Sequence, residues 1–186
     1  EKLCQANPDL HLLCVDPWTK YQGYTDIVKT LSIDIAYQHA SENLSKYNCT
    51  LIRKFSVEGA KEVPNGSLDF VYLDGNHLTI LSPEIGLLTA LQRLSLRNNQ
   101  LASLPPEIGQ LMALQWLNLS NNRFESLPPE IRQLMALQEL GLDGNQLKTL
   151  PREIGQLAAL QDLSLGGNQL TALPPEIGRL TALGRL

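Results

Sequence analysis

The residue types that most often carry metal or redox chemistry are sparse in this chain, which has three cysteines and three histidines. They are Cys4, Cys14, Cys49, His11, His39 and His77. No Cys-x-x-Cys pair occurs, and the histidines stand too far apart in sequence to resemble a metal-binding motif. The odd number of cysteines, with Cys14 inside an apolar run, predicts reduced and buried thiols. We therefore expect neither a metal site nor a catalytic residue.

Length and charge limit the class of protein. A chain of 186 residues can form one ordinary domain or two small units that share a core. The net charge of −4 is mild, and the absence of a basic patch argues against a nucleic-acid partner. No apolar run approaches the roughly 18 residues of a membrane span, and no signal-peptide pattern opens the chain. We expect a cytoplasmic protein that binds neither nucleic acid nor membrane.

A repeat of 23 residues fills most of the chain. Four copies read LQRLSLRNNQLASLPPEIGQLMA, LQWLNLSNNRFESLPPEIRQLMA, LQELGLDGNQLKTLPREIGQLAA and LQDLSLGGNQLTALPPEIGRLTA, and they start at Leu91, Leu114, Leu137 and Leu160. An earlier copy, LDFVYLDGNHLTILSPEIGLLTA, starts at Leu68, and LGRL at 183–186 begins a partial one. The five complete copies are called coils one to five. Their pattern, L-x-x-L-x-L-x-x-N-x-L, resembles the leucine-rich repeat family, and the LPxxIGxL tail resembles its 23-residue bacterial and plant subtype.

The physical properties of these residues agree with the resemblance. Leu94 and Leu96 alternate with polar residues, as a half-buried strand requires. An asparagine ends each strand, where a buried amide can bond main-chain groups of its own and the adjacent coil. These asparagines are Asn99, Asn122, Asn145 and Asn168. The prolines that follow have no N–H to donate to a neighbouring strand, so PPEIG should not be part of a sheet. It should be an extended or single-turn segment on the side of the solenoid opposite the strands. Residues 68–186 are predicted to form a leucine-rich repeat solenoid with a parallel concave sheet, in which each coil buries its leucines only against its neighbours.

Residues 1–67 show no such period and predict a different unit. Apolar strands are expected at 10–15 and 49–55, with a helix over 32–47 between them. Together with the strand at 68–73 they form a βαβ series, which predicts parallel pairing. The predicted fold class is α/β, with a Rossmann-like βαβ cap over 1–67 preceding the solenoid. We expect one sheet to continue from the cap into the solenoid, with 10–15 beside 68–73.

The same segment carries a second resemblance. NPDLHLLCVDPW and YNCTLIRKFSVEGAKEVPNGSLDFVYLDGNH, within residues 1–77, resemble the middle of a class I S-adenosylmethionine-dependent methyltransferase. The resemblance implies that Asp16 would bind the ribose hydroxyls, and that Asp74 would lie near the methyl-transfer site or, in some members, hold a metal. That family also needs a glycine-rich loop before this point, and no glycine precedes Asp16. Residues 1–67 are therefore interpreted as a methyltransferase-like fragment reused as an end cap, without a cofactor.

The favoured function is a non-enzymatic scaffold that binds a protein or peptide on its concave face. Side chains alternate across a strand, so the residues flanking the buried leucines should point outward there. The predicted binding residues are Phe70, Tyr72, Arg93, Arg97, Trp116, Asn118, Glu139, Asp143 and Asp162. Ser95, Ser120, Ser164, Gly141 and Gly166 are expected on the same face, the glycines admitting a partner's backbone. Aromatic and arginine side chains supply most hot spots, so Tyr72, Arg93, Arg97 and Trp116 are the strongest candidates.

Two alternatives stay open. One is a methyltransferase that binds S-adenosylmethionine and is incomplete in this chain. The other is a natural or engineered chimera of the two segments with no ligand. We also expect the last coil to fray or to associate end to end with another copy, because no polar capping segment follows the leucines of 170–186.

Overall fold

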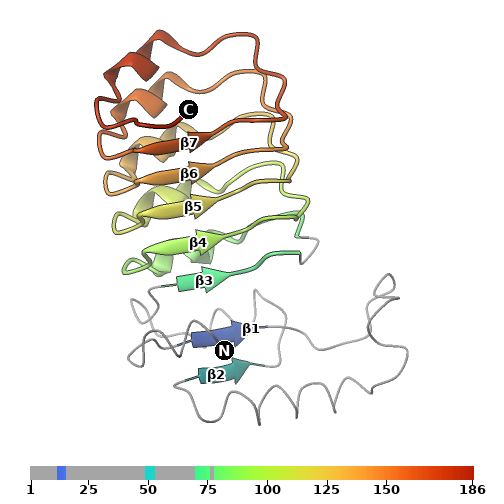
Figure 1. Ribbon diagram of the computed structural model, residues 1–186. Coiled ribbons are helices and arrows are strands. Elements are labelled where there is room, and N and C mark those ends of the chain that lie inside the picture. Colours follow the sequence, from blue (N-terminus) through green and yellow to red (C-terminus); the bar gives the residue numbers. More distant parts are fainter. Residues whose placement is uncertain (1–11, 16–48, 53–69, 76–77) are drawn as a thin grey trace. The chain divides into compact units, whose positions relative to one another are not determined.

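The computed structural model describes residues 12–15, 49–52, 70–75 and 78–186 (Figure 1). The chain divides into two compact units, Glu1–Val63 and Pro64–Leu186. The sequence-based boundary lies slightly later, after residue 67. Each unit is considered by itself below.

The first unit contains two short parallel strands. Strand β1 is Leu12–Val15 and β2 is Cys49–Ile52, and their register pairs the first residues, Leu12 with Cys49, and the last, Val15 with Ile52. The expected helix over 32–47 lies outside the described residues. The Rossmann-like cap therefore stays a prediction, as does the pairing of 10–15 with 68–73.

The second unit is a solenoid built on a parallel sheet of five strands in the order of the sequence (Figure 1). The strands are β3 Phe70–Tyr72, β4 Arg93–Ser95, β5 Trp116–Asn118, β6 Glu139–Gly141 and β7 Asp162–Ser164. Every pair is in the register of the repeat, so equivalent residues of successive coils lie side by side. The predicted solenoid and its parallel sheet are confirmed.

A single-turn 3-10 helix lies opposite each strand. These helices are η1 Pro83–Leu87, η2 Pro106–Gln110, η3 Pro129–Gln133, η4 Arg152–Gln156 and η5 Pro175–Arg179. Proline explains where they begin. Pro105 is extended, with φ −69° and ψ 149°, because the proline that follows disfavours the helical region for it. The main-chain N–H of Ile108 then donates to the Pro105 carbonyl at 3.0 Å. The side chain of Ile108 is fully buried in the core.

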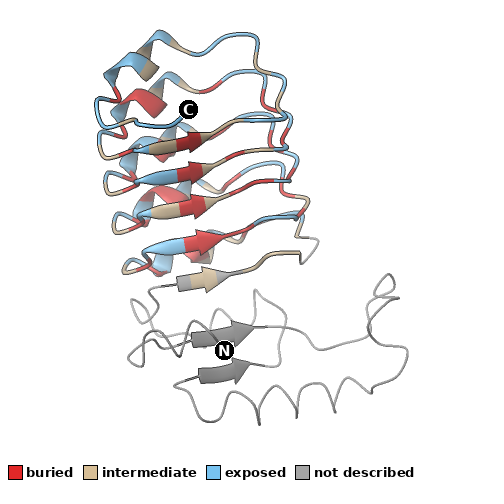
Figure 2. Ribbon diagram, viewed as in Figure 1, coloured by how far each residue is buried: buried red, intermediate tan, exposed pale blue. Residues whose placement is uncertain are grey.

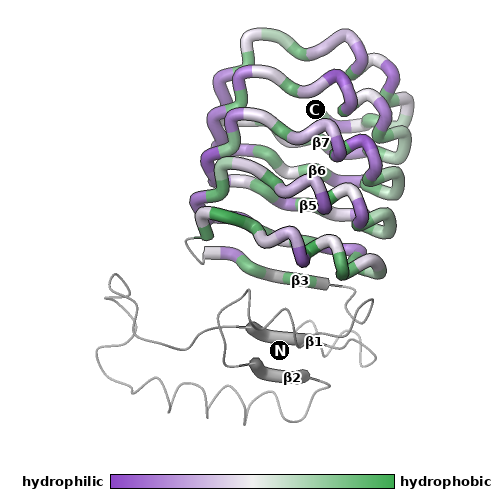
Figure 3. Tube along the Cα trace, turned by 180° about the vertical axis from the view of Figure 1, so that it is seen from behind, coloured by the Kyte–Doolittle hydropathy of each residue, from purple (hydrophilic) through white to green (hydrophobic). Residues whose placement is uncertain are grey.

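Leucines fill the space between the sheet and the 3-10 helices (Figure 2). In coil three, Leu117, Leu119, Phe124 and Ile131 are all fully buried. Seen from behind, hydrophobic and hydrophilic stretches recur at the same place in successive coils (Figure 3). Full burial of one such side chain contributes about 1.5–3 kcal/mol, and each coil obtains it only by packing on its neighbours.

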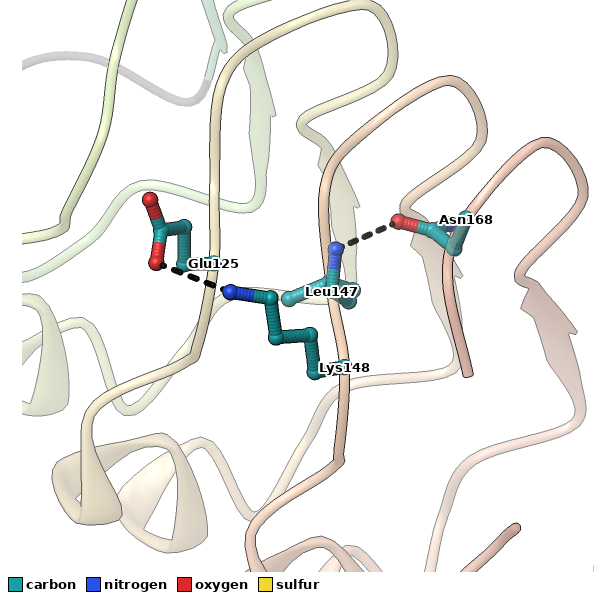
Figure 4. Close-up of polar contacts among 4 residues, drawn as sticks. All are labelled: Glu125, Leu147, Lys148 and Asn168. Atoms are coloured by element: carbon teal, nitrogen blue, oxygen red, sulfur yellow. Dashed lines mark hydrogen bonds and ion pairs between the residues drawn. The ribbon is translucent and has the colours of Figure 1, made fainter. Parts of the chain in front are cut away.

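In coils two to five, an asparagine joins the coil to the one before it. In coil four the side-chain Oδ1 of Asn145 accepts the N–H of Phe124 at 3.1 Å. Its Nδ2 donates to the carbonyls of Leu119 at 3.1 Å and Leu142 at 2.9 Å. The same geometry recurs in the next coil, where Asn168 accepts the N–H of Leu147 at 3.1 Å (Figure 4). The structural role predicted for the asparagine row is confirmed.

The residue before each buried asparagine turns the chain out of the sheet with a positive φ. It is asparagine in two coils, Asn98 (φ 54°) and Asn121 (φ 57°), and glycine in the next two, Gly144 (φ 65°) and Gly167 (φ 68°). Asn121 donates from Nδ2 to the Oδ1 of Asn98 at 2.9 Å. A Cβ added at Gly144 would collide with the amide end of that same Asn121 side chain, which would have to move to make room.

The hydrophobic residues of coil five are less buried than those of coil three. Leu173 is 36% exposed, whereas Leu127 at the same repeat position is 4% exposed. Helix η5 contains no buried residue, and Leu186 is 64% exposed. Within the described part of the chain, no helix is long and apolar enough to cross a membrane.

Replacing Asn145 with alanine should destabilise the solenoid strongly. The change leaves the buried N–H of Phe124 without its acceptor, and an unsatisfied buried group costs about 1–3 kcal/mol. The carbonyls of Leu119 and Leu142 each lose one donor but keep a second asparagine amide, from Asn122 and Asn168. We expect urea unfolding to show a loss of about 1–3 kcal/mol. Gln146→Ala is the matched control, because this neighbouring side chain is exposed, and it should change stability by less than about 0.5 kcal/mol. Equal losses in the two variants would contradict the role of the amide.

Amide hydrogen exchange should reveal the weaker packing of coil five. Local opening costs least where few apolar contacts cover the backbone. In dilute monomeric protein, we expect amides of 170–186 to exchange faster than those of 114–136. Equal protection of the two segments would show that the exposed leucines do not limit local stability.

Candidate functional site

The concave face is formed by three residues of each coil that alternate with buried leucines. The strand register places equivalent residues in rows across the five coils. The first row is Phe70, Arg93, Trp116, Glu139 and Asp162. Neighbouring strands lie about 4.8 Å apart, so each row spans about 19 Å. All nine predicted binding residues therefore belong to one sheet or to the turn just after a strand.

The first three coils bring arginine and aromatic residues together. Arg93 and Arg97 are exposed, and Trp116 is partly exposed beside Arg93 in the register. The backbones of Phe70 and Tyr72 lie in β3, paired with Arg93 and Ser95.

Two serines that were expected to point outward are buried. Ser95 is fully buried, and its hydroxyl donates to Oδ1 of Asp74 at 2.6 Å. Ser120 is 5% exposed, and its N–H donates to Oδ1 of Asn118 at 3.0 Å. The small side chain of Ser95 is covered by the Asp74 carboxylate, which sequence reasoning did not foresee. Neither serine is available to a partner.

Aspartates at the strand ends connect successive coils. Besides Ser95, Oδ1 of Asp74 accepts the N–H of Arg97 at 2.8 Å. In coil four, Oδ1 of Asp143 accepts the N–H of Gly166 at 2.7 Å. Both contacts lie 23 residues apart in sequence, one full coil. These two aspartates therefore have a structural role, whatever else they bind.

The glycines of the concave face leave room for side chains of the preceding coil. A Cβ added at Gly141 would come within 3.0 Å of the Asn118 amide, and one at Gly166 within 3.1 Å of Oδ1 of Asp143. Both contacts are tight. Each glycine thus accommodates a polar side chain of the protein itself, a role that sequence reasoning missed.

Negative charge gathers toward the C-terminal coils. Glu139 is exposed, and Asp162 forms an ion pair with Arg185 at 3.3 Å. Among the nine predicted residues, the charged ones that are exposed are Arg93, Arg97 and Glu139. The face is thus positive at coil two and negative from coil four onward.

Of the two residues implied by the methyltransferase resemblance, one is among the described residues. Asp16 lies outside the described residues, and Asp74 occupies the turn after β3. In the part of the chain that is described, no group of three or more His, Cys, Asp or Glu residues is placed to hold a metal ion.

Sequence reasoning missed a second polar cluster, on the side of the solenoid opposite the sheet. A cavity of about 320 Å³ spans η3, η4 and η5, and it is called the arginine cavity below. Its lining residues are Arg132, Arg152, Glu153, Gln156, Glu176 and Arg179. The sequence does indicate this cluster, because each of these three coils has one arginine where coil two has another residue.

Comparison with known families agrees with this geometry. The model of the leucine rich repeat family matches residues 66–124 and 112–170. The chain belongs to the leucine-rich repeat family. The comparison with curated proteins gives no match.

Several solved structures are similar to this leucine-rich repeat chain. An LRR protein of Leptospira interrogans is 38% identical, with a TM-score of 0.57 over 72% of this chain and 39% of that one. The crystal structure of PEPR1–AtPEP1 is 25% identical, with a TM-score of 0.63 over 75% of this chain and 24% of that one. The functional domain of InlJ from Listeria monocytogenes shares the fold, at 24% identity and a TM-score of 0.56, over 63% of this chain and 24% of that one. The chain thus spans 39% or less of the length of these structures.

Proposed function

We propose that this leucine-rich repeat protein is a non-enzymatic scaffold that binds a protein or an extended peptide on its concave face. The observation that carries the proposal is the position of Trp116. It lies partly exposed on the central strand, with Arg93 on one side in the register and Glu139 on the other. Large aromatic and arginine side chains on an accessible surface are the residue types that dominate binding energies.

The similar structures support a protein-binding scaffold in general. One of them pairs PEPR1 with AtPEP1. A face about 19 Å across has room for roughly five to six residues of extended chain, at about 3.3 Å for each residue. A short segment of a partner is therefore enough to cover it.

The charge distribution indicates the orientation of the partner. An acidic group would lie near Arg93 and Arg97, an apolar side chain near Trp116, and a basic group near Glu139. Complementary charge of this kind contributes to specificity and association rate more than to affinity. Asp143 and Asp162 add to the negative field although each already has a partner within the protein.

A methyltransferase remains the alternative function for the segment 1–77. The parallel pairing of β1 with β2 favours it, since the βαβ series requires that pairing. Asp16 and Asp74 would be the residues that contact S-adenosylmethionine. Cytoplasmic location and end-to-end association through coil five stay predictions.

Removing the central anchor should weaken binding without unfolding the protein. A peptide selected from a random library against the full chain serves as the partner. Trp116→Ala combined with Arg97→Ala should raise the Kd by at least about thirtyfold, because a buried anchor contributes about 2 kcal/mol or more. Isothermal titration calorimetry measures the change.

Gln115→Ala is the control for this test, since its side chain is exposed on the residue directly before Trp116. It should leave the Kd within about twofold, which corresponds to roughly 0.4 kcal/mol. A double variant that folds normally and keeps full affinity would show that the concave face is not the binding site. Failure to select any peptide would favour the chimera without a ligand.

Titration of the full chain with S-adenosylmethionine separates the two functions. The glycine-rich loop that would hold the cofactor has no counterpart before Asp16. We therefore expect no saturable heat up to about 1 mM cofactor, the concentration at which a binding free energy of roughly 4 kcal/mol would be detected. Saturable binding that Asp16→Ala abolishes would establish the methyltransferase alternative.

A further inference from the structure

The arginine cavity arises from three single departures from the repeat. Coil two has the unmodified segment LPPEIGQL at 104–111, whereas coils three, four and five have LPPEIRQL, LPREIGQL and LPPEIGRL. Each departure is an arginine, and each occurs at a different position of the segment. Although the three positions differ, all three arginines line the same cavity.

The fold does not require these arginines. The leucines and the isoleucine of the segment are unchanged in all four coils. Arg152 has 79% of its side chain exposed, so it adds little to the core. The equivalent residues of other coils are glycine, proline and glutamine, and those coils have the same 3-10 helix.

The charges of the cavity leave a positive excess. Arg152 forms an ion pair with Glu153 at 3.2 Å. In the described part of the chain, Arg132 and Arg179 form no ion pair. With Glu153 and Glu176 as the carboxylates, three guanidinium groups face two negative charges. This excess of one positive charge lies on a protein whose net charge is −4.

Glu153 remains ionised in this arrangement. A hydrogen bond from the backbone lowers the pKa of its carboxyl, and Arg152 and Arg132 lower it further. The side chain of Glu153 is 15% exposed, whereas that of Arg152 is 79% exposed and extends into solvent. An incoming anion would therefore meet Arg132 and Arg179 first, with Arg152 able to turn toward it.

Close packing of two coils forms one wall of the cavity. The main chain and Cβ of Glu176 lie directly against Gly155, so closely that no Cβ could be placed there. In coil three, the position equivalent to Gly155 is Arg132. Coils four and five thus touch through their backbones, and the Arg132 side chain stands beside them at the adjoining edge of the cavity.

We infer that the arginine cavity binds a phosphate group. A phosphate monoester carries about 1.5 to 2 negative charges and three acceptor oxygens, and guanidinium groups match such oxygens in a bidentate way. The three arginines come from three successive coils and line one cavity, so more than one guanidinium group can donate to the oxygens of a single phosphate. A volume of about 320 Å³ is near the lower limit for ligand pockets, so the group is a small phosphate ester or a phosphorylated side chain. This site lies on the opposite side from the concave face and does not depend on peptide binding there.

Calorimetry on the full chain tests the inference with two probes, inorganic phosphate and a capped tripeptide that contains phosphoserine. The test variant is Arg132→Gly/Arg179→Gln, which introduces the residues that coil two has at these positions. We expect saturable binding to the unmodified chain and at least about tenfold weaker binding to this variant. Stronger binding of the tripeptide would assign the site to a phosphorylated side chain, and equal binding would assign it to free phosphate.

A control variant removes the same charge elsewhere. Arg123→Gln/Lys148→Gln changes two exposed cations outside the cavity and should keep the affinity within about twofold. Arg132→Lys/Arg179→Lys keeps the charge but loses the planar fork, so its affinity should be intermediate. No saturable binding of either probe up to about 10 mM would overturn the inference. An equal loss in the control variant would also overturn it, because the effect would then be one of net charge alone.

Discussion

The main chain of each coil leaves the sheet at a sharp turn whose N–H and C=O groups face the interior, where water does not reach them. In each of coils two to five, one asparagine amide supplies the missing hydrogen bonds, accepting from the preceding coil and donating to both coils. Because the bonds of Asn145 reach Phe124 and Leu119, a side chain of fixed length joins two coils at the distance that the strand pairing also sets. The leucine core, the strand register and the position of each 3-10 helix all depend on that spacing.

This constraint leaves both outer surfaces open to variation. The sheet residues between the leucines and the exposed residues of the 3-10 helices do not contribute to the asparagine bonds. Trp116 on one surface and Arg132 on the other belong to the same coil, yet neither is part of its buried core. The same backbone can therefore carry an aromatic and charged face on one side and a cluster of arginines on the other.

The sequence predicts the solenoid well because the same pattern of buried leucines and a strand-end asparagine occurs in all five coils. The period locates every strand, and the recurring asparagine identifies its buried partner. Burial of Ser95 could not be predicted in this way, since it depends on Asp74, a residue of the preceding coil at a different repeat position. The arginine cavity was missed for a similar reason: its residues occupy three different repeat positions and meet only in space. Residues 1–67 have no internal period. Their strands were expected from apolar runs, and only the methyltransferase-like assignment depended on a resemblance.

The contacts between glycines and the preceding coil have a consequence for the order of the array. Asn118 and Asn121 of coil three lie over Gly141 and Gly144 of coil four, and Asp143 of coil four lies over Gly166 of coil five. In coils three and four, polar side chains thus lie over positions where the next coil has glycine and leaves room for them. The five coils are similar in sequence, but these contacts favour the present order of coils three, four and five. Exchanging, duplicating or deleting one of these three coils would separate a side chain from the glycine that makes room for it. A change in the number of coils is therefore easier to accommodate before coil three.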